Sequence, residues 1–242
     1  MTAPVVTLDR WAVPTGAIPR VLGLVAADTV LRSRGGPSRR PELLGPPGTG
    51  MTFQRVLGTS RGRTFLPTEA DLHHWVMVTA WRGEPAPAAA TPFGSGITAV
   101  AQAHVRIRLH PITSVGRWSG AQPFGDGPDR DGGSAAMPEG NVAALTRARV
   151  RLQRWPEFYR HAPQVAGSLA AADGLLMAFG IGEAPLGRQG TFSLWRDGSA
   201  LGAFLRSSAA HRRVVAAATM RGWYAEELFT RFTVLGIDGE LA

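Results

Sequence analysis

His211 is the residue of this chain whose position most suggests chemistry. In a helix predicted over 209–221, His211 shares one face with Val214, Val215 and Ala218, at offsets of three, four and seven residues. An imidazole on the inward face of a helix can ligate an iron held between that helix and a sheet. The alternative is a core histidine that is hydrogen-bonded to a backbone carbonyl, and the pattern alone favours this alternative.

The absence of some ligand and nucleophile residues, and the spacing of others, excludes several classes of site. The sequence has no cysteine, which excludes disulfides, zinc-thiolate sites, iron–sulfur clusters held by this chain, a thiolate-ligated haem and a cysteine nucleophile. His73 and His74 are adjacent and the remaining histidines are scattered. An iron site with two histidines and one carboxylate is an alternative that no spacing supports. Phosphate-binding, nucleophile-elbow and dinucleotide-binding motifs are also absent.

The charge of the chain comes from arginine. All 26 basic residues are arginine against 18 acidic residues, and the formal net charge is +8. Arginines cluster at 32–40 and 147–154, but no nucleic-acid motif or aromatic-interleaved basic strip accompanies them. We therefore expect a solvated or anion-facing surface and no nucleic-acid partner.

The length and the hydropathy pattern favour a soluble protein. The 242 residues, 44% of them hydrophobic, are enough for one large domain or two fused small ones. The longest apolar stretches, 18–31 and 165–181, contain Arg, Asp, Gly or Ser before they reach the roughly 20 residues that cross a bilayer. Residues 1–10 lack the pattern of an export signal. We expect a cytoplasmic enzyme without a transmembrane segment.

The elements that must position these residues follow one pattern twice. Hydrophobic periodicity predicts the following elements for the first copy: a strand over 5–11, a helix containing Ile18 to Val30, a loop over 34–50, strands over 52–57 and 74–81, an Ala-rich helix before Ala103 and a strand over 104–112. It predicts the following for the second copy: a strand over 142–152, a helix, strands over 175–181 and 191–195 around a turn at 185–190, helices over 199–206 and 209–221, and a strand over 229–235.

Strand-helix-strand-strand-helix-strand is the ferredoxin-like order. We therefore predict an α+β fold of two tandem ferredoxin-like halves, 1–124 and 141–242, that pack as an internal double α+β barrel. The polar, Gly/Pro-rich residues 125–140 are the predicted linker.

Motifs from Arg117 to the C-terminus make the chain similar to the spheroidene monooxygenase family, the haem-containing carotenoid oxygenases of photosynthetic bacteria. The motifs are Arg117, Trp118, Gly120, Pro123 and Phe124; Leu145, Thr146, Arg147 and Ala148; Gly180, Ile181, Gly182, Glu183 and Pro185; Thr191, Phe192, Ser193 and Trp195; His211; Gly222, Trp223, Glu226, Glu227, Leu228, Arg231 and Phe232. In the first half the similarity is limited to His73, Trp75 and Trp81, and the loop over 34–50 has no counterpart in the family.

The resemblance implies a haem b cofactor, dioxygen as oxidant, a ferredoxin-like electron donor, and oxygen insertion into a hydrophobic small molecule. It favours His211 as the iron ligand, with His73 as the second candidate. A nearby carboxylate such as Glu226 or Glu227 can accept from the second imidazole nitrogen, although a solvated helix end is the preferred interpretation of both glutamates.

Five further residues are candidates for the site. Arg147 can contact a haem propionate or bound oxygen, or else be a surface arginine on a strand. Trp195 is a candidate for cofactor binding, and Trp118, Phe124 and Trp223 are candidates for an apolar substrate pocket, with plain core packing as the alternative for each.

Two other functions stay open at this point. Related double α+β barrels include haem-dependent lyases or dehydratases that do not activate oxygen, and a non-catalytic haem-binding protein is a further alternative. The molecule is also a candidate homodimer.

Overall fold

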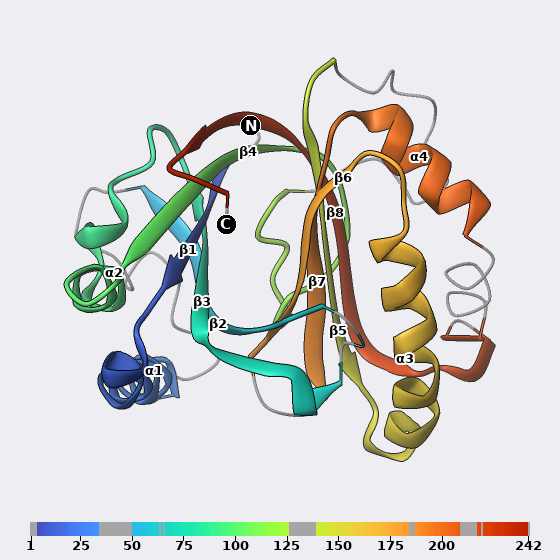
Figure 1. The fold of residues 1–242 in the computed structure, drawn as a ribbon, viewed down its shortest axis with the longest axis horizontal. Coiled ribbons are helices and arrows are strands. Elements are labelled where there is room, and N and C mark those ends of the chain that lie inside the picture. Colours follow the sequence, from blue (N-terminus) through green and yellow to red (C-terminus); the bar gives the residue numbers. More distant parts are fainter. Residues whose placement is uncertain are drawn as a thin grey trace. The chain divides into compact units, whose positions relative to one another are not determined.

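The chain forms strands and helices in the order β-α-β-β-α-β, twice over, in a computed structural model (Figure 1). The structure describes residues 4–33, 50–62, 64, 66–125, 139–183, 187–208, 217–218 and 220–241. The first set is β1 (Val5–Ala12), α1 (Ile18–Ser33), β2 (Met51–Ser60), β3 (Ala70–Trp81), α2 (Pro92–Thr98) and β4 (Ala103–Gly116). The second set is β5 (Val142–Val150), α3 (Trp155–Ala170), β6 (Leu175–Gly182), β7 (Arg188–Trp195), α4 (Gly198–Ser207) and β8 (Tyr224–Asp238). Short 3-10 helices lie at Thr15–Ala17, Pro67–Glu69, Ala88–Ala90 and Leu152–Arg154.

Internal contacts divide the chain into two units. Unit 1 comprises Met1–Gly58, Leu72–His110 and Leu235–Ala242, and unit 2 comprises Thr59–Asp71 and Pro111–Val234. The units are interleaved along the sequence, so several strands contribute residues to both.

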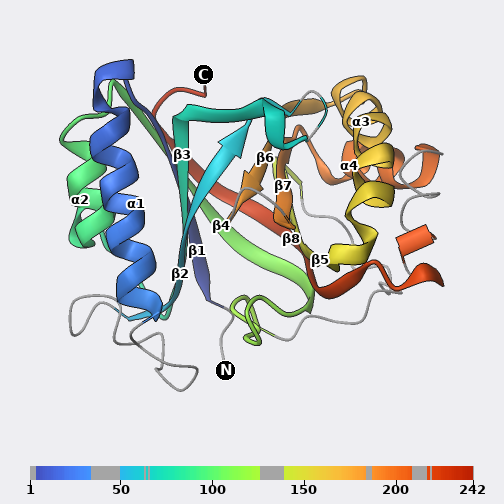
Figure 2. The same cartoon turned by 90° about the horizontal axis from the view of Figure 1, so that it is seen from below.

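Unit 1 is a sheet with both of its helices on one face. Its strand order is β4-β1-β3-β2, and β1 is antiparallel to both of its neighbours. Helices α1 and α2 lie side by side over the sheet (Figure 2). The core between them is built on Trp11, Trp75, Phe93 and Ile97, none more than 5% exposed.

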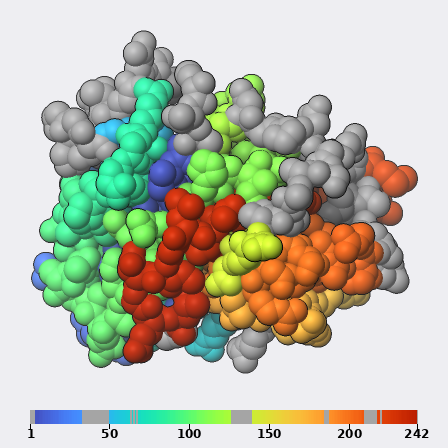
Figure 3. Space-filling view, turned by 90° about the horizontal axis from the view of Figure 1, so that it is seen from above, coloured from blue at the N-terminus to red at the C-terminus, as the bar shows by residue number. Residues whose placement is uncertain are grey.

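Unit 2 has the same kind of arrangement. The strand order is β6-β7-β5-β8 with antiparallel neighbours throughout. Helices α3 and α4 cover one face, and the outer side of α4 lies at the molecular surface (orange in Figure 3). The core under these helices contains Val142, Leu169, Trp195 and Phe204.

Local sequence explains where three helices begin. Thr91 caps α2 by accepting a hydrogen bond from the Gly94 amide at 3.1 Å, and Asp197 caps α4 by accepting from the Ala200 amide at 2.8 Å. Pro156 lies in the first turn of α3, where its missing N–H costs nothing.

Most strands extend further than their predicted ranges, and β5, predicted over 142–152, instead ends at Val150. β8 begins at Tyr224 instead of near residue 229, so the interpretation of Glu226 and Glu227 as a helix end is wrong. The predicted turn at 185–190 is too long, because Arg188 already pairs in β7. Of the predicted helix over 209–221, the described residues Ala217, Ala218, Met220 and Arg221 are helical.

The structure leaves parts of the prediction without a test. The loop predicted over 34–50 lies outside the described residues except for Gly50, and residues 126–138 of the predicted linker also lie outside them. The halves 1–124 and 141–242 therefore stay a prediction. Within the described part of the chain, no helix is long and apolar enough to cross a membrane.

Candidate functional site

Arg147 is a buried cation in the middle of β5. Side chains alternate between the two faces of a strand, and Arg147 lies on the face opposite to that of Val142, which packs under α3 and α4. Its partners across the sheet are Gly190 on β7 and Leu228 on β8. Only 3% of the residue is exposed, so a compensating charge is required.

Two carboxylates supply that charge. The Nε of Arg147 donates to Oε1 of Glu183 at 3.0 Å, and Nη1 donates to Oε1 of Glu226. The guanidinium carbon lies 5.9 Å from the centre of the Trp118 ring, and the indole N–H of Trp118 donates to the same Glu183 oxygen. One cation and two carboxylates thus form a hydrogen-bonded group whose formal charge is −1.

The second carboxylate also holds a tight turn. The amides of Ser119 and Gly120 donate to the two oxygens of Glu226 at 2.9 and 2.8 Å. Trp118 and Ala121 close the turn by exchanging backbone hydrogen bonds of 2.8 and 3.2 Å. Ser119 and Gly120 have φ of +53° and +78°, values typical of the two central residues of a type I′ turn.

This arrangement keeps Glu226 ionised. Partial burial raises the pKa of Glu226, but hydrogen bonds from the Gly120 and Ser119 amides and the charge of Arg147 outweigh it. The resulting pKa of Glu226 lies below its ordinary value of 4.5. The carboxylate therefore remains available to bind the turn at neutral pH.

Gly116 allows the chain to approach β8 before the turn. It has φ of +100°, and a Cβ atom there would lie 2.1 Å from the carbonyl oxygen of Glu227. The amide of Arg117 donates to that same oxygen at 2.7 Å. A residue without a Cβ atom is needed at this point.

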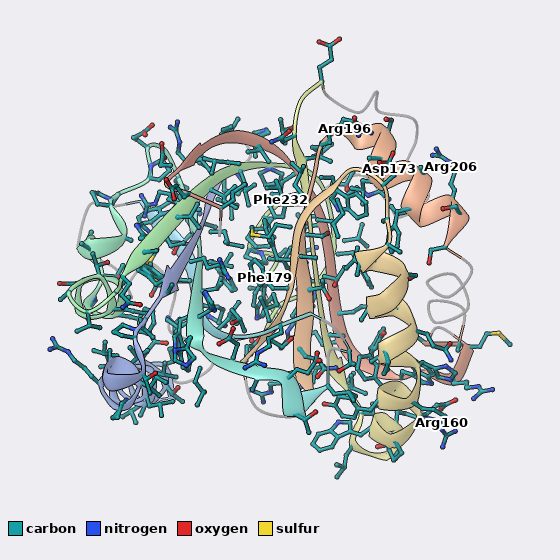
Figure 4. The ribbon with its side chains drawn as sticks, viewed as in Figure 1. Arg160, Asp173, Phe179, Arg196, Arg206 and Phe232 are labelled. Atoms are coloured by element: carbon teal, nitrogen blue, oxygen red, sulfur yellow. The ribbon has the colours of Figure 1, made fainter. Side chains whose placement is uncertain are left out.

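Large aromatic side chains lie on the same face of the sheet as the polar group. Phe124 packs edge-on against Trp118 at 6.4 Å and against Phe232 at 5.4 Å between ring centroids. Phe179 and Phe192 pack against each other on the same face, also at 5.4 Å. Figure 4 shows Phe179 and Phe232 on the side of the sheet away from α3. Trp118 is 0% exposed and Phe124 is 2% exposed, so both side chains are packed in the interior.

After Val142, which is fully buried, the opposite face of β5 has smaller and less buried side chains. Ala144, Thr146 and Ala148 face the helices and are half-buried, whereas Leu145 and Arg147 on the other face are buried. Trp195 and Trp223 lie on the helix-facing side. The structure therefore does not bring these two tryptophans together with Arg147.

Trp195 and Trp223 are fully buried beside different helices. Trp195 packs against Phe204 of α4 with ring centroids 5.3 Å apart, and its indole N–H donates to Ser193 Oγ at 2.9 Å. Trp223 stacks on His161 of α3 at 5.7 Å and donates to Glu157 Oε2 at 3.1 Å. Both positions are those of core residues, and their proposed contacts with a cofactor or substrate stay predictions.

The structure describes one of the two candidate iron ligands, His73. His211 lies outside the described residues. His73 belongs to unit 1, where its Nδ1 lies 3.0 Å from the carbonyl oxygen of Val13. This contact is consistent with a structural role for His73. The described residues contain no cluster of three or more potential protein ligands for a metal ion.

The sequence alone did not predict the carboxylate partners of Arg147. Glu183 and Glu226 are 36 and 79 residues from Arg147 in the chain, and only strand pairing brings them together. The one available signal was an arginine in a strand whose alternate residues are apolar, because such a cation requires an anion nearby.

Comparison with known proteins places the chain among named oxygenases. It matches no family model. It is 30% identical over 190 residues to spheroidene monooxygenase of Rhodobacter capsulatus, and the match covers 77% of each chain. The corresponding protein of Cereibacter sphaeroides is 28% identical over 192 residues, with 78% of this chain and 57% of that protein covered. That of Rubrivivax gelatinosus is 38% identical over 133 residues, with 55% and 48% covered.

Solved structures share the fold at low sequence identity. An aldoxime dehydratase aligns with a TM-score of 0.51 and 11% identity over 96% of this chain and 82% of its own. A second aldoxime dehydratase, in complex with butyraldoxime, aligns with a TM-score of 0.50 and 10% identity over 96% and 80%. At this identity the likeness concerns the fold alone.

Proposed function

Because the chain belongs to the spheroidene monooxygenase family and is therefore an oxidoreductase, we propose that it is a haem-dependent monooxygenase acting on a carotenoid-like or other hydrophobic metabolite. The observation that carries the proposal is the 30% identity to the Rhodobacter capsulatus enzyme over 77% of each chain. In the reaction one oxygen atom enters the substrate at carbon, and the other leaves as water with two electrons and two protons.

The helix-facing side of β5 fits a planar, largely apolar group such as haem. A macrocycle that lies against a sheet needs small side chains beneath it, and Thr146 and Ala148 are small and half-buried there, next to Ala144, which packs against the core under α4. Their neighbours across β7, Ser193 and Thr191, are also small. We propose this surface of unit 2 as the seat of the cofactor.

His211 is the proposed iron ligand. The predicted helix that carries it ends beside β8, since the Ala218 carbonyl accepts a hydrogen bond from the Trp223 amide at 3.0 Å. Bound haem would supply the activation of dioxygen, while this chain would hold the metal through an imidazole, because no cysteine is present.

Arg147 is better suited to positioning than to direct contact with haem. Its Nε and Nη1 already donate to two carboxylates, and it lies on the face of β5 opposite to the proposed seat. Through Glu226 it holds the turn 118–121, and through Glu183 it holds the Trp118 indole. The earlier prediction that Arg147 contacts a propionate or bound oxygen stays a prediction.

We further propose that each β-α-β-β-α-β set is a ferredoxin-like half. The strand orders β4-β1-β3-β2 and β8-β5-β7-β6 support this, because both follow the pattern fourth-first-third-second. A ferredoxin-like electron donor is the proposed partner, since the reaction needs external electrons. The homodimer and the cytoplasmic location stay predictions.

The test is oxygen transfer to spheroidene by the haem-loaded protein. With a chemical reductant, an electron-transfer protein and isotopically labelled dioxygen, we expect a product that carries the label, and no product without oxygen or without reductant. An oxygenated product that lacks the label, or a product formed equally without oxygen, would contradict the proposal.

The fold similarity favours one alternative, a dehydratase. Butyraldoxime offered to the ferrous protein without dioxygen distinguishes the two. Formation of the nitrile, with no oxygen transfer to spheroidene, would establish the alternative instead.

A further inference from the structure

One end of unit 2 carries arginines around two exposed apolar side chains. This surface, called here the arginine-rich end, consists of Arg149, Arg151, Leu152, Arg154, Arg160, Arg188, Met220 and Arg221. We propose that the arginine-rich end docks the protein onto the surface of an anionic lipid bilayer. The proposal rests on these surface residues and does not depend on the proposed function.

Backbone pairing brings the residues of this end together. Arg149 at the end of β5 is directly opposite Arg188 at the start of β7. The amide of Arg151 donates to the Trp223 carbonyl at 2.8 Å, which places the segment with Met220 and Arg221 beside the segment with Leu152. Figure 4 shows Arg160 at the adjoining end of α3, with its side chain directed outward.

The positive charge of this end is mostly uncompensated. Among the described residues, no ion pair involves Arg149, Arg151, Arg160 or Arg188. Glu157 is the acceptor for the other two arginines: it lies 3.6 Å from Arg154 Nη1 and accepts from Arg221.

The neighbouring carboxylate Glu226 is already hydrogen-bonded to other groups. Glu226 lies opposite Arg149 in the register, but its oxygens accept from Arg147 and the turn amides. Within the described part of the chain, Glu157 is thus the carboxylate paired with this group of six arginines, and it pairs with Arg154 and Arg221.

Leu152 and Met220 are the apolar component. Leu152 is 70% exposed and Met220 is 86% exposed, the two highest values among the exposed large hydrophobic residues. A large apolar side chain in water gains free energy when it enters the acyl boundary of a bilayer, and neighbouring arginines gain from anionic headgroups. An anionic bilayer accommodates both components at one surface, because the arginines contact headgroups while the two apolar side chains enter the acyl boundary.

Such docking suits an enzyme whose substrate dissolves in membranes. If the proposed function is correct, the protein would meet its substrate at the bilayer surface. If it is wrong, the docking surface remains, because vesicle binding does not require haem or turnover.

Vesicle co-sedimentation of the full chain tests the proposal. With vesicles of phosphatidylcholine mixed with phosphatidylglycerol, we expect sedimentation of the protein that salt reverses, and little sedimentation with phosphatidylcholine alone. Arg151→Gln and Arg160→Gln should each weaken the partition coefficient about fivefold, which is the effect of one basic side chain near an anionic surface. Leu152→Ser combined with Met220→Ser should weaken it at least tenfold, because the gain from two apolar side chains is lost.

Two matched variants control for charge and hydropathy. Arg206→Gln at the exposed end of α4 and Leu176→Ser on β6, which is 50% exposed, change the same residue types elsewhere in unit 2 and should bind like the wild type. Equal binding to neutral vesicles, loss of binding in the control variants, or binding to an acidic protein but not to anionic vesicles would each overturn the proposal. Circular dichroism and melting temperature of each variant should match those of the wild type, which shows that weaker binding does not come from a folding defect.

Discussion

Arg147 shows what a single strand residue can and cannot reveal. The sequence predicts its strand correctly, because Thr146 and Ala148 alternate with it. Its burial could not be predicted, since that depends on Glu183 and Glu226 arriving from other strands. The choice between a surface arginine and a functional arginine is thus decided by partners that one sequence does not identify.

Replacing Arg147 should destabilise unit 2. In Arg147→Met, Glu183 and Glu226 lose their shared cation at sites where their side chains are 11% and 14% exposed, and we expect a loss of about 3 kcal/mol in the free energy of unfolding. Urea denaturation measures this value. Arg149→Met, which changes an exposed arginine on the same strand, should stay within about 0.5 kcal/mol of the wild type. A loss for Arg147→Met as small as that would contradict the buried ion-pair group.

The two tyrosines provide a test that involves pH. Burial raises the pKa of Tyr224 to about 12, and burial also raises the pKa of Tyr159 despite the hydrogen bond from the Gly187 amide. The neutral phenol is therefore favoured in the folded state. Its contribution to stability is fully present below the ordinary pKa of 10.0 and is lost as pH rises through the folded value.

Ultraviolet titration follows both phenols, because the chain has two tyrosines. At pH 10.0 the Tyr224 phenol of the folded protein should be almost entirely neutral, and the folded protein should contain less phenolate than the protein in denaturant, which should be about half ionised there. Half ionisation of the folded protein at that pH would mean that both phenols are solvated.

At the scale of elements, periodicity located every strand of the described chain, but not their ends. β8 is the clearest case: its charged residues Glu226 and Glu227 interrupt the apolar pattern, so the predicted strand begins near 229 while the observed strand begins at Tyr224. The turn amides and Arg147 that stabilise Glu226 in a strand come from distant segments, which local patterns do not include.

The approach of Gly116 to β8 is an element-scale contact that mutation can test. In Gly116→Ala, the new Cβ would meet the Glu227 carbonyl at 2.1 Å and the backbone would keep an unfavourable φ of +100°. We expect a loss of stability of at least about 2 kcal/mol by thermal or urea unfolding.

Gly167→Ala is the matched control. Gly167 lies within α3, and a Cβ there would meet no atom within 4 Å, so alanine should stabilise the helix by up to about 1 kcal/mol. The same loss in both variants would indicate a general intolerance of glycine replacement and would contradict the close approach at Gly116.

At the scale of the whole molecule, the sequence predicts the doubled element order and the family, and the site only in part. The repeat is visible because hydrophobic periods of strand and helix recur in the same sequence in both halves. The predicted site divides in the structure: Trp118 and Phe124 join Arg147 on one face of the unit 2 sheet, whereas Trp195 and Trp223 lie on the helix side. These residues belong to one series of motifs, and such a series does not tell which face of a sheet each residue takes.

The absorption spectrum of the protein loaded with haem tests the central claim most directly. Oxidised and dithionite-reduced spectra, with a pyridine haemochrome for stoichiometry, should show about one haem b per chain in the wild type and in His73→Ala, because His73 contacts the Val13 carbonyl instead. His211→Ala, with unchanged folding by circular dichroism, should lose the Soret band or shift it strongly. A wild-type protein that stays colourless after reconstitution, or a His211→Ala protein with an unaltered spectrum, would contradict the account.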